Sequence, residues 1–172
     1  TIERDSTFVK ELLTDGKCDI AFLRSESSSV KEFNSIPYMI DYLTAVLPAT
    51  HPLAKADNLP FEQLRGETFL LFPEHSFIND LCIRECRNAG FEPHIAYTGN
   101  RGATLIDLVR NGAGITLMMH HSARQENDSS LAFIPVTPGI YSYISLNYAK
   151  EKPLSPQAES FVRYVKAHKR DF

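Results

Sequence analysis

The sequence has few cysteines and no long apolar run. Cys18, Cys82 and Cys86 form neither a dense nor an even set, which excludes the disulfide framework of a small secreted domain. No apolar run approaches the roughly 18 residues needed to span a bilayer. The charged opening segment TIERDSTFVKE lacks the apolar core of a signal peptide. We therefore expect a reduced, cytoplasmic setting and no membrane partner.

The chain also lacks an excess of basic residues. Its 18 lysines and arginines against 21 acidic residues give a net charge of -3, which argues against a nucleic-acid-binding domain. The basic run Lys166, His168, Lys169 and Arg170 is interpreted as a solvated helix end. With 43% hydrophobic and 23% charged residues, the composition is typical of a globular protein. The length of 172 residues predicts one domain or two small lobes.

Motifs of catalysis and metal binding are missing as well. The sequence has no GxSxG, P-loop or HExxH motif. Cys82 and Cys86 lie four residues apart, with His75 nearby and His120-His121 downstream, but structural zinc sites use tighter loop spacing. Both cysteines fall on the apolar face of a predicted helix, where free cysteine behaves as a small hydrophobic residue. We expect no enzyme activity, no metal and no cofactor.

Apolar residues at helical spacing, with capping residues at their ends, predict four helices. These run from Asp5 or Ser6 to Gly16, from Ser76 to Gly90, from about Arg101 to Asn111, and onward from Ser155-Pro156. Short apolar runs predict buried strands at residues 19–23, 43–47, 68–72, 94–97 and 115–119, and alternation predicts a half-exposed strand at 141–148. The polar, serine-rich residues 24–34 are predicted to be a loop. The alternation of strand and helix favours a mainly parallel α/β sheet.

Four segments in order resemble the effector-binding domain of LysR-type transcriptional regulators. They are LLTDGKCDIAF at residues 12–22, LTAVLPATHPLA at 43–54, LVRNGAGITL at 108–117 and LSPQA at 154–158. The third matches the family's LVxxGxGIxxLP element except for its final proline. Its glycines suit a turn after a helix (Gly112) and a tight entry into a strand (Gly114). All four segments are scaffold features and none is catalytic.

The resemblance implies an α/β fold with two lobes, like that of a type 2 periplasmic binding protein, with two crossover strands and the ligand in the cleft. It places the crossovers near residues 43–46 and 144–146. Lobe I would then comprise residues 1-43 plus 146-172, and lobe II residues 44-145. The family's domain opens with one more strand and helix. Here that N-terminal βα unit is expected to be missing, with the chain entering near the second strand at Thr1-Ile2.

The candidate ligand-binding residues follow from the geometry of open α/β sheets. Ligands bind beyond the carboxyl ends of the strands, often at helix N-termini, whose unpaired N–H groups suit an anion. Three predicted loops meet this condition, and the family's equivalent loops line the effector cleft. With an arginine that can pair with an anion, the predicted effector-binding residues are Ser6, Thr7, Arg24, Ser76, Phe77, Gly99, Asn100 and Arg101. The alternative is that Ser6 and Ser76 are only helix caps.

The function implied by the resemblance is effector sensing and dimerisation within a DNA-binding transcriptional regulator. The expected partners are a small, anionic metabolite and a second copy of the chain, in a dimer or, at full length, a tetramer. Promoter DNA would be bound only through an N-terminal domain that is absent here. Two alternatives stay open: a solute-binding protein that serves a transporter, and an enzyme on the same fold.

Overall fold

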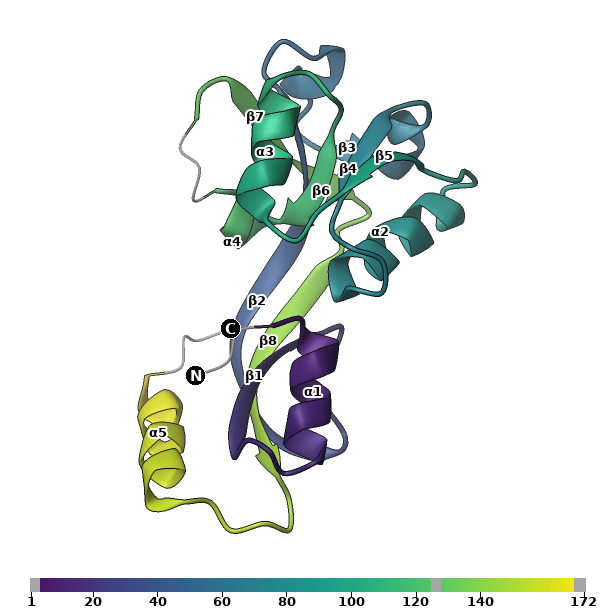
Figure 1. Ribbon diagram of the computed structural model, residues 1–172. Coiled ribbons are helices and arrows are strands. Elements are labelled where there is room, and N and C mark those ends of the chain that lie inside the picture. Colours follow the sequence, from purple (N-terminus) through teal and green to yellow (C-terminus); the bar gives the residue numbers. More distant parts are fainter. Residues whose placement is uncertain (1–3, 125–127, 169–172) are drawn as a thin grey trace. The chain divides into compact units, whose positions relative to one another are not determined.

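The computed structural model describes residues 4–124 and 128–168, and it divides into two compact units (Figure 1). Unit 1 comprises Thr1–Asp41 with Tyr141–Phe172, and unit 2 comprises Tyr42–Ile140. The lobe limits implied by the resemblance, 1-43 plus 146-172 and 44-145, stay a prediction. The strand expected at Thr1-Ile2 lies outside the described residues, and so do Lys169 and Arg170 of the basic run.

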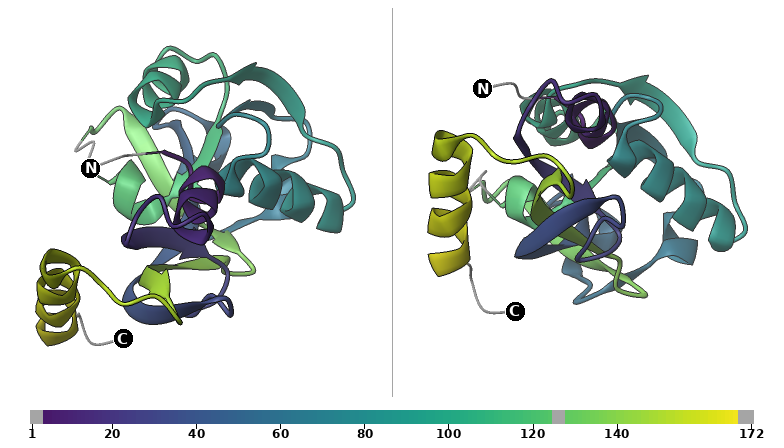
Figure 2. Two further views of the ribbon diagram at one scale, coloured as in Figure 1. Left: turned by 60° about the horizontal axis from the view of Figure 1, so that its bottom comes forward. Right: turned by 90° about the horizontal axis from the view of Figure 1, so that it is seen from below.

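Unit 1 contains a sheet in which strand β8 is central. β1 (Ile20–Ser25) pairs with β8 (Tyr141–Ala149) in antiparallel fashion, and β2 (Phe33–Pro48) lies on the other side of β8 before it continues into unit 2. Helix α1 (Ser6–Thr14) packs on Ala21 and Leu23, whereas α5 (Pro156–Ala167) packs on Leu146, which is paired with Phe22. Since successive strand residues face opposite sides, the two helices cover opposite faces of the sheet (Figure 2).

The ends of these helices agree with the sequence prediction. Asp5 caps α1 by accepting from the Thr7 backbone N–H, and Gly16 follows the helix with a φ of 69°. Ser155 caps α5 by accepting from the Ala158 N–H, with Pro156 at the first helical position. These side chains satisfy amide groups that a helix cannot pair internally, which explains why the boundaries are readable from sequence.

Unit 2 is built around the second half of β2. Strands β6 (Thr116–Met119) and β7 (Leu131–Thr137) both pair with β2 in antiparallel fashion, and the short β3 (Leu59–Pro60) is parallel to β7. β4 (Thr68–Leu71) pairs with β5 (His94–Thr98) in parallel, and Phe69 of β4 forms a parallel bridge to Ile115. The helical segments are η1 (Pro52–Lys55), η2 (Phe61–Leu64), α2 (Phe77–Asn88), α3 (Gly102–Arg110) and α4 (His120–Ala123).

Two apolar clusters hold unit 2 together. Helix α2 contributes Leu81, Cys82 and Cys86 to a cluster with Phe69 and Leu71, all of them at most 2% exposed. Helix α3 contributes Leu105, Ile106 and Val109 to the second cluster, which includes Leu70. Because Leu70 faces the opposite side of β4 from its neighbours Phe69 and Leu71, the two helices pack on opposite faces. The prediction that the cysteines are core residues is confirmed.

Three details of the predicted architecture are wrong. The sheet is not mainly parallel, because the β1–β8, β2–β6 and β2–β7 pairs are antiparallel. The predicted loop at 24–34 is too long, because β1 extends to Ser25 and β2 begins at Phe33. The predicted strand at 43–47 is too short for the same reason, since it is only the second part of β2. Strand β8 is not half-exposed, because Ser145 and Asn147, which are paired with Leu23 and Ala21 on the face that α1 covers, are completely buried. All three features depend on how the strands pair, and a local apolar pattern does not reveal that pairing.

Three further elements, β3, β7 and α4, were not predicted from sequence. Within residues 4–124 and 128–168, none of the helices combines the length and apolar character required to cross a membrane.

We expect Gly114→Ala to destabilise the protein far more than Gly112→Ala. A Cβ atom at Gly114, where φ is 154°, would clash with the Thr68 carbonyl oxygen, which accepts the backbone N–H of Ile115, the residue before β6. At Gly112, with a φ of 75°, nothing lies within 4 Å, so only backbone strain is added. Urea denaturation should show losses of about 3 and about 1 kcal/mol, respectively. Equal losses would contradict this account.

We expect Cys82 and Cys86 to be unreactive in the folded protein. Burial raises the pKa of the Cys82 thiol well above its usual value and that of Cys86 to about 12, so almost no thiolate is present at neutral pH. Titration with a chromogenic disulfide should modify at most the partly buried Cys18 before unfolding and all three thiols in denaturant. Cys18→Ser is the control, and rapid reaction of that variant in the native state would show that the core opens.

Candidate functional site

In unit 1, the predicted site residue Arg24 lies in a buried polar cluster at the end of β1. Its Nη1 and Nη2 atoms each lie 3.2 Å from Oδ2 of Asp41 on β2, and Nη1 donates to Ser142 Oγ on β8 at 2.6 Å. The Arg24 side chain is 16% exposed and that of Asp41 is 2% exposed. Burial lowers the pKa of the Arg24 guanidinium, whereas the Asp41 carboxylate acts in the opposite direction. The cation is therefore already paired inside the protein.

Ser6 is joined to this cluster, whereas Thr7 is not. The Oγ atom of Ser6 accepts a hydrogen bond of 3.0 Å from the Arg24 backbone N–H. The alternative that Ser6 only caps α1 is wrong, because Asp5 is the cap. Thr7 is exposed, and its backbone N–H is held by Asp5 at 2.8 Å. The structure thus brings Ser6 and Arg24 together, with Thr7 beside them at the start of the helix.

In unit 2, the other two predicted loops begin at one edge of the sheet. β4 and β5 are parallel, so their carboxyl ends point the same way, and the Gly99 N–H donates to the Leu71 carbonyl at 3.0 Å. Ser76 caps α2 by accepting from the Asn79 N–H at 3.3 Å. Phe77 packs against the apolar cluster under α2, so part of its side chain serves the core.

Asn100 and Arg101 are exposed at the end of β5. Arg101 is the N-terminal flanking residue of α3, and its side chain makes no capping hydrogen bond. The exposed Tyr97 ring lies over Gly99, where a Cβ atom would be 2.7 Å from Cε1 and 2.8 Å from the hydroxyl oxygen unless the ring rotated away. The predicted residues therefore form two sets, three residues in unit 1 and five in unit 2.

Several polar residues that contact these two sets were not predicted from sequence. Asp41 and Ser142 hold Arg24, and both sit within strands where an apolar pattern draws no attention to them. Asn79 is 1% exposed and donates from Nδ2 to the Phe72 carbonyl at 2.8 Å, which ties the first turn of α2 to the end of β4. A polar residue on the inward face of an amphipathic helix is the signal that identifies Asn79.

A third polar group stands at the end of β6. The His120 ring stacks on Tyr42 with centroids 4.3 Å apart and planes inclined by 18°. Its Nδ1 atom lies 3.3 Å from Thr44 Oγ1, and Thr44 is completely buried. Because β6 and β2 are antiparallel neighbours, this contact follows directly from their register. From the sequence, His120 was considered only as a metal ligand.

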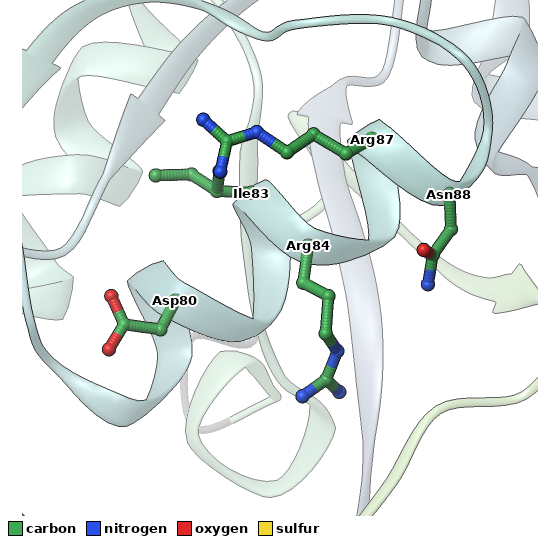
Figure 3. Close-up of a pocket in the computed structure, with 5 residues that line it drawn as sticks. All are labelled: Asp80, Ile83, Arg84, Arg87 and Asn88. Atoms are coloured by element: carbon green, nitrogen blue, oxygen red, sulfur yellow. The ribbon is translucent and has the colours of Figure 1, made fainter.

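Two surface hollows of unit 2 contain none of the predicted residues. One, of about 450 Å³, is lined by the outward-facing residues Asp80, Ile83, Arg84, Arg87 and Asn88 of α2 alone (Figure 3). Arg87 Nε pairs with Glu92 at 2.8 Å, so its charge has a partner. The other hollow, of about 220 Å³, lies by the first residue of β4, at the opposite edge from the predicted loops. Its wall includes His51 and Glu67, whose Nε2 and Oε2 atoms are 3.3 Å apart.

Among the residues that the structure describes, no group of three or more histidine, cysteine, aspartate or glutamate side chains is placed to hold a metal ion. Cys82 and Cys86 lie within the apolar cluster. The site residues are hydroxyl, amide and guanidinium groups together with backbone N–H groups, which suit a hydrogen-bonded organic anion.

Comparison with known proteins places these features in a family. Residues 1–170 match the LysR substrate binding domain. The transcriptional dual regulator GltC of Bacillus subtilis (strain 168) is 26% identical over 159 residues, which cover 92% of this chain and 53% of that protein. The chain spans about half the length of the curated relatives that it matches.

Solved structures of the same kind share the fold. The regulatory domain of CcmR from Synechocystis PCC6803, in complex with 2-PG, has a TM-score of 0.85 at 16% identity, with 98% of this chain and 81% of that chain covered. The effector-binding domain of QuiR in complex with shikimate has a TM-score of 0.76 at 20% identity, with 97% and 81% covered. The predicted α/β fold, that of a LysR effector-binding domain, is confirmed, and this chain belongs to the LysR substrate binding domain family.

Proposed function

We propose that this chain is the effector-sensing and dimerisation domain of a LysR-type transcriptional regulator. The observation that carries the proposal is the family match over residues 1–170, in a chain whose relatives are transcriptional regulators about twice its length. The rest of such a protein would supply DNA binding, and the whole would act in the cytoplasm. Neither the solute-binding nor the enzyme alternative has support from these relatives.

We propose further that the effector is a small anionic metabolite. Two neighbours of this fold are complexes with 2-PG and with shikimate, so the fold accommodates ligands of this size. In this chain the predicted loops offer hydroxyl groups, the start of α3, which has no side-chain cap, and the exposed Arg101. A guanidinium and helix N-termini both favour a carboxylate or phosphate group.

The two sets of strand-end residues are the proposed effector contacts. Ser6, Thr7 and Arg24 belong to unit 1, and Ser76, Phe77, Gly99, Asn100 and Arg101 belong to unit 2. Arg24 differs from Arg101 in being paired with Asp41, so Arg101 is the residue of the two whose charge is more available to an anion. Dimerisation would use other surfaces, and edge strand β5, with all five residues exposed, offers one.

A thermal-shift screen tests the proposal directly. The panel would contain shikimate, 2-PG, amino acids, aromatic carboxylates and sugar phosphates, each without and with added salt. A ligand present at 100 times its dissociation constant should stabilise the domain by about 2.7 kcal/mol, which raises the melting temperature by several degrees. We expect a saturable response to an acidic compound and no chemical conversion of it. Turnover of the compound would favour an enzyme instead.

Substitution of Arg101 gives the matched test of the site. Arg101→Gln should weaken the binding of the compound found in the screen by about tenfold or more, because a hydrogen bond to a charged group is lost. Arg87→Gln on the outer face of α2 is the control and should leave the affinity unchanged, since Arg87 pairs with Glu92 away from the strand ends. Equal effects of the two substitutions would show that binding reflects overall charge, and the site in unit 2 would then be wrong.

A further inference from the structure

A chain of hydrogen bonds that passes through the covalent side chain of Arg24 links four elements of unit 1. It begins at Ser6 on α1, whose Oγ accepts the backbone N–H of Arg24 on β1 at 3.0 Å. The Arg24 side chain continues it to Asp41 on β2, with both terminal nitrogens at 3.2 Å from one carboxylate oxygen. It ends at Ser142 on β8, whose Oγ lies 2.6 Å from Nη1.

This chain is held away from water over most of its length. Asp41 is 3% and Ser142 is 0% exposed, and the Arg24 side chain is 16% exposed. A buried charge that loses its partner is strongly penalised, so the guanidinium and the carboxylate must move together. Hydrogen bonds in such surroundings are also stronger than those at the surface. A displacement of the Arg24 guanidinium would therefore carry the Asp41 carboxylate with it.

The two strand residues that bind the Arg24 side chain, Asp41 and Ser142, lie at the limits of unit 1. Asp41 is the last residue of the first segment of unit 1, and the polypeptide passes from it into unit 2. The polypeptide returns to unit 1 at Tyr141, and Ser142 is the next residue. Arg24 thus contacts both strands at the points where the chain leaves and re-enters this unit.

Ser6 is available for this role because it is not needed by its own helix. Asp5 provides the cap of α1 through the Thr7 N–H. An ion pair that only stabilised the three strands would not require a hydrogen bond to the start of α1. The Ser6 link therefore adds α1 to the strands that Arg24 joins.

We propose that Asp41 and Ser142 are positioning residues that, through Arg24, couple the start of α1 to strands β2 and β8. A ligand that contacts Ser6 or Thr7 then shifts the two strands that lead into and out of unit 2. This use of the coupling rests on the proposed function. The coupling itself is a property of unit 1 and is measurable without ligand, so a failed ligand screen and a failed coupling experiment are separate results.

Amide hydrogen exchange of the ligand-free protein tests the coupling from the helix side. Ser6→Ala removes the acceptor and leaves the Asp5 cap intact. We expect exchange to become about fivefold faster at residues 141–146 of β8 and 36–42 of β2, since the loss of one hydrogen bond lowers the local opening energy. Thr7→Ala is the matched control and should change only α1. If Ser6→Ala alters α1 and β1 alone, the coupling is absent and the proposal is wrong.

Asp41→Asn tests the same coupling from the strand side. The amide keeps the shape of the carboxylate and removes its charge, and circular dichroism would verify that the variant is folded. We expect faster exchange in α1 from Val9 onward, in addition to β2 and β8. Asp128→Asn is the control, because it breaks an exposed pair with Arg110 in unit 2 and should leave α1 unchanged. Unchanged exchange in α1 for a folded Asp41→Asn variant would also overturn the proposal.

Discussion

The pairing of one long strand is the constraint on which both units depend. β2 runs from Phe33 to Pro48, lies beside β8 in unit 1, and pairs with β6 and β7 in unit 2. Because a buried backbone must have its N–H and C=O groups paired, these partners are obligatory. A strand shared in this way takes polar residues out of water together with apolar ones, and each buried polar group then needs a partner of its own.

The buried polar residues of unit 1 follow from this requirement. Asp41 on β2 is compensated by Arg24, and Asn147 on β8 accepts from Ser35 at 2.6 Å and donates to Ser145. Removing one member of such a group leaves the other unsatisfied at a cost of about 1–3 kcal/mol for neutral groups. The buried polar groups of unit 1 therefore each require a specific partner, and they include the predicted effector-binding residue Arg24.

Sequence patterns located the helices and scaffold turns well and the sheet poorly. The starts of α1, α2 and α5 were predicted because capping residues such as Ser76 and Ser155 act within a few positions of the helix they cap. β7 was missed, and β2 was predicted at a third of its length, because their neighbours are distant in sequence. The site was predictable to the extent that strand ends and helix starts define it. The partners of Arg24 were not, since Ser142 lies 118 positions away.

Four segments of the amino-acid sequence indicated the family by resemblance. The sequence alone also determined the order of most elements, the capping residues and the apolar faces, including the core position of both Cys82 and Cys86. These properties arise from local backbone preference and periodicity, which act over one or two turns. The tertiary structure decided which strands are antiparallel, that Ser145 and Asn147 are buried, and that the charge of Arg24 is paired internally. Those outcomes depend on contacts between residues far apart in the chain, and only the pairing of the strands brings such residues together.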